Sequence, residues 1–207
     1  LKVVVSDGRE GKEAIGYMKA YVNMDVATLN VGSQPLANNA HVKYPDAFGM
    51  VSLNDLKTYS VDYAIANEVN AKNVDFKFYC FGASGSPRLY SMDNTGKDGE
   101  FSGSTGKLSA IKVKNLTRFA ILSNFDYENA TVASISSEIL SSSIAQSLLD
   151  PIAVGNVIAF RTGGSSAAGG GRIGVMKVIN ITEPKELVSN NATARVMTVE
   201  IKFPKKK

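Results

Sequence analysis

The side chains best suited to catalysis or metal binding are few in this chain. It contains one histidine, His41, and one cysteine, Cys80. Transition-metal sites ordinarily combine several such ligands, so no His/Cys metal cluster is predicted. Cys80 takes an apolar position in a strand-like run, which indicates a buried, structural thiol. The segment Gly82-Ala-Ser84-Gly-Ser86 lacks the final glycine of a nucleophile elbow, so the sequence favours no serine triad.

A glycine-rich segment matches two nucleotide-binding patterns by letter but not by context. Residues 169–174 read Gly-Gly-Gly-Arg-Ile-Gly, the spacing of a dinucleotide fingerprint, but strand-like residues follow where a helix is required. Residues 164–169 have P-loop spacing, yet glycines stand where Lys and Ser or Thr are needed. We therefore predict a mobile hairpin tip over residues 163–171 and no cofactor.

Acidic residues supply two weaker hypotheses. Residues 93–101 resemble a calcium loop, but Lys97 interrupts the ligands and Thr105 stands where the bidentate Glu belongs. The sequence therefore predicts no metal site. Asp55, Asp62 and Glu68 could supply the paired carboxylates of a hydrolase, which leaves hydrolysis as a third alternative.

Tyrosines are the remaining functional candidates. Tyr17, Tyr21 and Tyr79 fall on the polar side of alternating segments, and Tyr90 lies near a loop, as do Tyr59 and Tyr63. Planar rings that carry a hydroxyl suit sugar stacking or a protein interface. We predict ligand binding by four of them, although the same rings could pack under loops or across strand pairs. These four are Tyr17, Tyr21, Tyr79 and Tyr90.

Charge and hydropathy exclude two classes of partner. The formal net charge is +4, and Lys205, Lys206 and Lys207 supply three of those charges, so the rest of the chain is nearly neutral. Nucleic-acid binding favours a basic face with interleaved aromatics, which is absent from the sequence. No stretch has the ~20 apolar residues that a membrane helix needs. We predict a glycan or a surface protein as partner, no nucleic acid and no transmembrane segment.

The elements that must position these residues are mainly strands. Apolar residues alternate with polar ones over residues 17–26, 74–80 and 197–203, which predicts sheets with one face in water. Residues 60–70, with Ser60 as N-cap, and residues 132–149 show helical spacing. The sequence therefore predicts a β-rich α+β fold with antiparallel or mixed sheets and two helices packed on them.

The last third of the chain predicts a closing antiparallel meander over residues 155–203. With 207 residues, the chain fits one domain best. In the alternative, residues 1–81 and 108–207 are two halves that each contain a strand–helix–strand unit. The Gly- and Ser-rich residues 82–107 would then join them, as a linker or as an ordered loop.

Several short segments, taken together, resemble a group of known proteins. The segments begin at Met50 (Met-Val-Ser-Leu-Asn-Asp-Leu), Val74 (Val-Asp-Phe-Lys-Phe), Arg88 (Arg-Leu-Tyr-Ser), Gly155 (Gly-Asn-Val-Ile-Ala-Phe-Arg-Thr), Gly174 (Gly-Val-Met-Lys-Val) and Thr198 (Thr-Val-Glu-Ile-Lys). They are similar to uncharacterised secreted or surface-lipoprotein domains of Bacteroidetes bacteria. The resemblance implies an outer-surface or periplasmic location, with a lipid anchor expected before Leu1, and it carries no catalytic residues.

These observations lead to one expected function and two alternatives. We expect an extracellular or cell-surface module that binds glycan or protein without catalysis. A structural or adhesion component, in which exposed strand edges pair with neighbours, is the first alternative. The hydrolase is the second.

Overall fold

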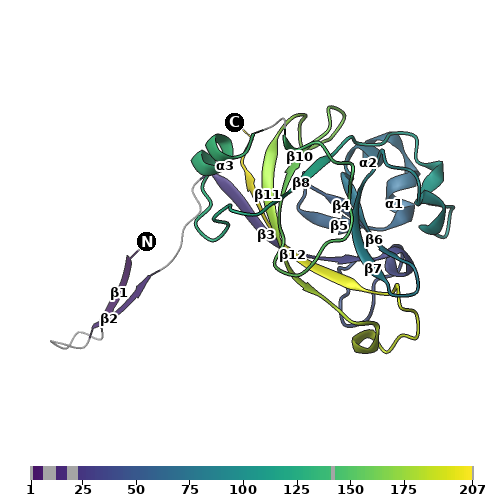
Figure 1. The fold of residues 1–207 in the computed structure, drawn as a ribbon, viewed down its shortest axis with the longest axis horizontal. Coiled ribbons are helices and arrows are strands. Elements are labelled where there is room, and N and C mark those ends of the chain that lie inside the picture. Colours follow the sequence, from purple (N-terminus) through teal and green to yellow (C-terminus); the bar gives the residue numbers. More distant parts are fainter. Residues whose placement is uncertain (1, 7–12, 18–22, 141–142, 207) are drawn as a thin grey trace.

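Two stacked antiparallel sheets form the body of the protein (Figure 1). The computed structural model describes residues 2–6, 13–17, 23–140 and 143–206. Within these residues, the first sheet has the order β3 (Met24–Gly32), β12 (Val196–Pro204), β11 (Ile173–Ile181), β10 (Val157–Arg161) and β8 (Arg118–Leu122). The second has the order β5 (Lys57–Tyr59), β4 (Met50–Ser52), β6 (Phe76–Phe81), β7 (Ser86–Ser91) and β9 (Leu148–Leu149). A hairpin also pairs β1 (Lys2–Ser6) with β2 (Glu13–Tyr17). The predicted β-rich α+β fold is confirmed.

The main hydrophobic core lies between the two sheets. Alternate residues of β12 point into it, and β10, β11 and β6 supply further large side chains from both sides. The buried members from β12 are Met197, Val199, Ile201 and Phe203. The run β10–β11–β12 pairs antiparallel throughout, which confirms the predicted meander. β3 adds to its outer edge, so the sheet joins segments from both ends of the chain.

A helix and an irregular segment cover the outer face of the first sheet (Figure 1). α3 (Val132–Glu138) buries Ile135, and the residues after it bury Ile139 and Ile144 in the same cluster. The predicted helix over residues 132–149 is therefore too long. Serines in this segment bond back to carbonyls of their own chain, which weakens helix formation. Beyond Ile144, tertiary pairing takes over, because Gln146 bridges to β8 and residues 148–149 join the second sheet.

Two short helices pack on the outer face of the second sheet (Figure 1). α1 (Val61–Ala66) begins at the predicted N-cap, where the Ser60 hydroxyl accepts from the Tyr63 N–H at 3.2 Å. The predicted single helix over residues 60–70 is divided at Asn67, whose backbone is extended. Asn67 caps α2 (Glu68–Lys72) by accepting from the Asn70 N–H. The helical spacing was correct, but it spans two helices.

Polar positions of β6 are buried, contrary to the predicted half-solvated strand. Asp75, just before β6, and Lys77 and Tyr79 within it were predicted to face water, and all three are buried. Residues 92–111 cover this face through the turns η2 (Asp98–Glu100) and η3 (Leu108–Ala110) and the side chains of Phe101 and Leu108. Residues 82–107 contain β7, which pairs with β6 on one side and β9 on the other. The domain division itself stays a prediction.

The glycine-rich residues 163–171 fold back onto the body of the protein. The Ala167 N–H donates to the Lys72 carbonyl at 2.9 Å, and the Ser165 hydroxyl donates to Asn115 Oδ1 at 2.7 Å. Ala168 is buried in the main core. The predicted mobile tip is corrected, because this loop packs on the core through its small side chains. The strand predicted after it is present as β11.

One buried carboxylate under this loop makes stability depend on pH. Asp75 accepts from the Leu53 N–H at 2.8 Å, from Asn115 and from Ser166, and burial raises its pKa to about 6. Asp55 is a like charge nearby. Because the folded state holds this proton more tightly than the unfolded chain, the contribution of Asp75 to stability is full below about pH 4 and is lost as pH rises through about 6, a change of about 3 kcal/mol.

Asp75→Asn should remove this dependence. Free energies of unfolding from urea titrations between about pH 4 and pH 7 are the measurement, and the difference between wild type and variant is the quantity to follow. Asp25→Asn, at an exposed ion pair with Lys205, is the matched control. A wild-type-minus-variant difference that stays constant across this pH range would contradict the prediction.

Candidate functional site

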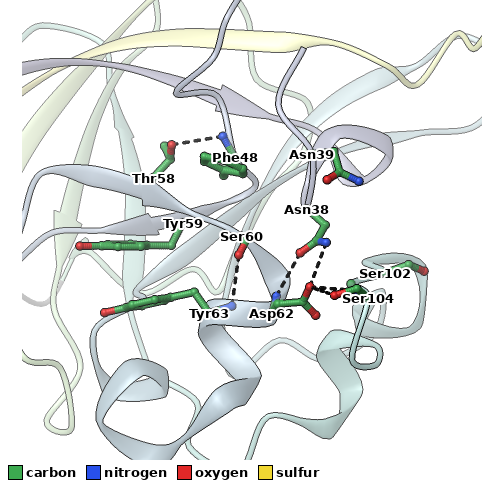
Figure 2. A pocket seen from close by; sticks show the side chains of 11 residues that line it. Asn38, Asn39, Phe48, Thr58, Tyr59, Ser60, Asp62, Tyr63, Ser102 and Ser104 are labelled. Carbon is green, nitrogen blue, oxygen red and sulfur yellow. Dashed lines mark hydrogen bonds between the residues drawn. The ribbon is translucent and has the colours of Figure 1, made fainter. Parts of the chain in front are cut away.

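An open hollow of about 860 Å³ lies where the edge of the second sheet meets the start of α1 (Figure 2). β5 and the first turn of α1 form one wall, and two loops, at residues 38–39 and 102–104, form the other. Its lining residues are Asn38, Asn39, Phe48, Thr58, Tyr59, Ser60, Asp62, Tyr63, Ser102, Gly103 and Ser104. The hollow is therefore built from three separate parts of the chain.

Two stacked tyrosines form the aromatic part of this wall (Figure 2). The rings of Tyr59 and Tyr63 are 3.9 Å apart between centroids and 14° from parallel. Their hydroxyls are held from behind: Tyr59 donates to Asp55 at 2.6 Å, and Tyr63 accepts from Asn73 at 2.9 Å. Burial and then the bond to Asp55 raise the pKa of Tyr59, so it stays a neutral phenol. Both rings are half-buried and fixed in place.

Asp62 ties the opposite rim of the hollow to α1. Its carboxylate accepts from the N–H groups of Ser104 and Thr105, each at 2.9 Å, from the hydroxyls of both residues, and from Asn38 at 3.1 Å. Several hydrogen bonds hold the Asp62 pKa well below its usual range, and the bond from the Ser104 hydroxyl has the largest effect. Gly103 lies against this carboxylate so closely that a Cβ atom there would collide with it. Asp62 is thus a clasp for residues 102–105.

The other acids considered as hydrolase candidates are also engaged. Burial opposes ionisation of Asp55, but hydrogen bonds from Tyr59, Asn73 and Asn54 outweigh it and lower its pKa. Glu68 pairs with Lys72 on the surface of α2, and this contact lowers its pKa. None of Asp55, Asp62 and Glu68 has a raised pKa, the property expected of a general acid at neutral pH.

The described lining of the hollow carries a single charge, the negative charge of Asp62. Among the described residues that line it, none is Lys, Arg or His, and Asp62 is the single carboxylate. The remaining polar groups are the amides of Asn38 and Asn39 and the hydroxyls of threonine and serines. Amides and hydroxyls that flank aromatic rings can hydrogen-bond and stack an uncharged, polyhydroxylated ligand.

The predicted tyrosine sites do not meet at this hollow. Tyr79 and Tyr90 were predicted to be exposed, but they are buried at 3% and 4% exposure, with ring centroids 5.6 Å apart under residues 93–101. The Tyr79 hydroxyl donates to Glu100. Tyr17 ends β2, and Tyr21 lies outside the described residues. Tyr59 and Tyr63 form the aromatic wall instead, and the signal that could have identified them is their position before the N-cap Ser60 and in the first turn of α1, where side chains pack together much as in a hydrophobic staple.

The other motifs of the sequence have structural partners. In the calcium-like segment, Asp93 forms a two-bond pair with Arg118, and Asp98 pairs with Lys77 and Lys114. Across the part of the chain that the structure describes, no three His, Cys, Asp or Glu side chains gather in a way that could hold a metal ion. In the same part, no helix has the length and apolar character to cross a membrane.

The isolated cysteine and histidine lie apart from each other. Cys80 is buried in the main core, as predicted, and burial raises the pKa of its thiol to about 12. His41 lies in a loop, where its Nδ1 accepts from the Lys43 N–H at 3.1 Å. Neither residue lines the hollow.

Comparison with known proteins gives information about the fold. No protein-family model and no curated protein matches the chain. A solved structure, a DUF4466 family protein from Parabacteroides merdae, is similar with a TM-score of 0.53 and 14% sequence identity. The match covers 94% of this chain and spans 58% of that protein's length. The chain therefore shares its fold with an uncharacterised domain from a Bacteroidetes bacterium, the group to which the sequence resemblance points.

Proposed function

We propose that this protein is a non-enzymatic binding module that takes an uncharged glycan in the hollow beside Tyr59 and Tyr63. The stacked pair carries the proposal, because two rings held rigidly by Asp55 and Asn73 give a sugar a preformed apolar edge. On the opposite wall, Asn38 and Ser104 are bonded to Asp62, and the amide of Asn39 and the hydroxyl of Ser102 supply donors and acceptors for sugar hydroxyls.

Binding without catalysis is favoured by the state of the acids. Glycoside cleavage needs one carboxyl that keeps its proton near neutral pH and a second that acts from across the bond. Among the described residues that line the hollow, Asp62 is the one with a carboxylate, and this group has a lowered pKa and holds residues 102–105. A location at the outer surface or in the periplasm belongs to the same proposal, and its support is the sequence resemblance.

A glycan array of neutral and acidic oligosaccharides tests the proposal. We expect neutral glycans to bind, and Tyr59→Ala to weaken that binding about tenfold, because it removes one ring of the stack. Asn39→Ala should weaken it less, because Asn39 is an exposed side chain of the rim. Calorimetry with the strongest array ligand is the measurement.

Two controls separate binding from folding. Tyr44→Ala removes a half-buried tyrosine that does not line the hollow, so affinity should stay unchanged. Tyr59→Phe keeps the ring but loses the bond to Asp55, so it should weaken binding less than Tyr59→Ala does. Binding of acidic glycans alone, or full affinity in Tyr59→Ala, would reject the proposal.

A further inference from the structure

The hollow beside the tyrosine pair adjoins a second one. A hollow of about 410 Å³ lies between β3 and β5, the edge strands of the two sheets. The two hollows share Phe48 and Thr58 as lining residues, so they meet at these side chains. Thr28 and Asn30 line the second hollow from β3, and Lys57 lines it from β5.

Phe48 is held in place at this junction from both sides. Its carbonyl accepts from the Gly32 N–H of β3 at 3.0 Å, and its N–H donates to the Thr58 hydroxyl of β5 at 3.2 Å. Phe48 is half-buried, and Figure 2 shows its side chain beside Thr58. These bonds anchor the backbone of Phe48, and an aromatic ring between two hollows gives a ligand a surface to cross from one to the other.

The second hollow has the same chemical character as the first. Thr28 and Asn30 contribute a hydroxyl and an amide, and Leu29 and Leu56 contribute apolar surface. Its charged residues, Asp46 and Lys57, have opposite signs and cancel. The pair of hollows therefore forms one strip of polar and aromatic surface along the edge of the sandwich, on which Asp46, Lys57 and Asp62 leave a net charge of −1.

We infer that this strip binds a glycan chain rather than a single sugar or a chain end, with successive units in the two hollows and Phe48 under the units between them. The inference rests on the proposed function, since it assigns the ligand class of the same site. Both volumes fall in the range of ~300–1,000 Å³ typical of ligand sites, so each hollow has room for part of a chain.

Chain length is the direct test. Affinities are measured by calorimetry for cello-, malto-, manno- and xylo-oligosaccharides of two to six units. In the series that binds, the hexasaccharide should bind about tenfold or more tightly than the disaccharide, because only the longer chain reaches both hollows. This comparison uses the unaltered protein, so it needs no variant to fold.

A variant that blocks the second hollow tests whether the gain in affinity with chain length arises there. Thr28→Arg places a long side chain in the second hollow, and it should remove the gain in affinity of the hexasaccharide over the disaccharide. Thr95→Arg changes an exposed threonine outside both hollows and should leave both affinities unchanged. Unfolding temperatures check that both variants fold.

The outcomes separate this inference from the function on which it rests. Equal affinity for all chain lengths overturns the inference and leaves glycan binding intact. A length-dependent gain that survives Thr28→Arg in the folded protein also overturns it. No binding in any of the four series, with no neutral glycan bound on the array, rejects the proposed function itself.

Discussion

Replacing Asp98 by alanine is expected to lower the free energy of unfolding by about 3 to 5 kcal/mol, since it leaves a buried ammonium without its carboxylate. Lys77 Nζ lies 2.7 Å from Asp98 Oδ1, and both side chains are almost fully buried. The carbonyls of Ser91 and Asn94 accept from Lys77, but they carry no charge to balance it. Burial, opposed mainly by Asp98, already lowers the Lys77 pKa, so loss of Asp98 should lower it further.

Removing the lysine of the pair should lower the free energy of unfolding by less than removing the aspartate does, and this asymmetry makes the prediction specific. In Lys77→Met, Asp98 keeps Lys114, whose Nζ lies 2.9 Å from Asp98 Oδ2, and methionine fills part of the lysine's volume. Urea titrations near neutral pH give both free energies of unfolding. Asp25→Ala, which breaks the exposed pair with Lys205, is the control and should change stability by less than about 1 kcal/mol. An Asp98→Ala variant as stable as this control would show that the buried pair contributes nothing.

Lys77 also illustrates what the sequence could and could not predict. The alternation over residues 74–80 identifies β6 and its inner face correctly, because strand geometry repeats every two residues. It misplaces Lys77 and Tyr79 in water, because the segment that covers them comes later in the chain and has no period of its own. A local pattern indicates which residues share a face, whereas burial of that face depends on remote segments.

The helices show the same limit. Ser60 is a correct N-cap because capping depends on a contact three residues away. The predicted end of the second helix is wrong because β8 and β7 pair with residues 146–149, and these pairings override a weak, serine-rich helical pattern.

At the candidate site, too, local contacts could be predicted from the sequence and remote contacts could not. Tyr59 precedes the N-cap Ser60 and Tyr63 lies in the first turn of α1, so their proximity is local and could be predicted from the sequence. The opposite rim depends on Asp62 reaching Ser104 and Thr105, more than 40 residues away. No spacing or motif in the sequence indicates that contact. The aromatic wall was therefore predictable in principle, and the hollow was not.

Asp62→Ala is expected to weaken glycan binding about 100-fold, a larger loss than any single lining tyrosine should give. The substitution removes the acceptor for two backbone N–H groups and two hydroxyls at residues 104–105, and the acceptor for Asn38. A ligand would then have to order this rim as it binds, which reduces affinity in addition to the lost contacts. Calorimetry with the array ligand measures the change.

Hydrogen exchange reports on the same clasp without a ligand. The amides of Ser104 and Thr105 should exchange faster in Asp62→Ala, because both donate to Asp62, while amides of β12 keep their wild-type rates. In wild type this protection should persist down to about pH 4: the lowered Asp62 pKa means that the clasp is lost only as pH falls through its folded-state value. Faster exchange with unchanged glycan affinity would show that the rim is no part of the binding site. Loss of both the exchange protection and the glycan affinity would show that the binding surface depends on one carboxylate at the start of α1.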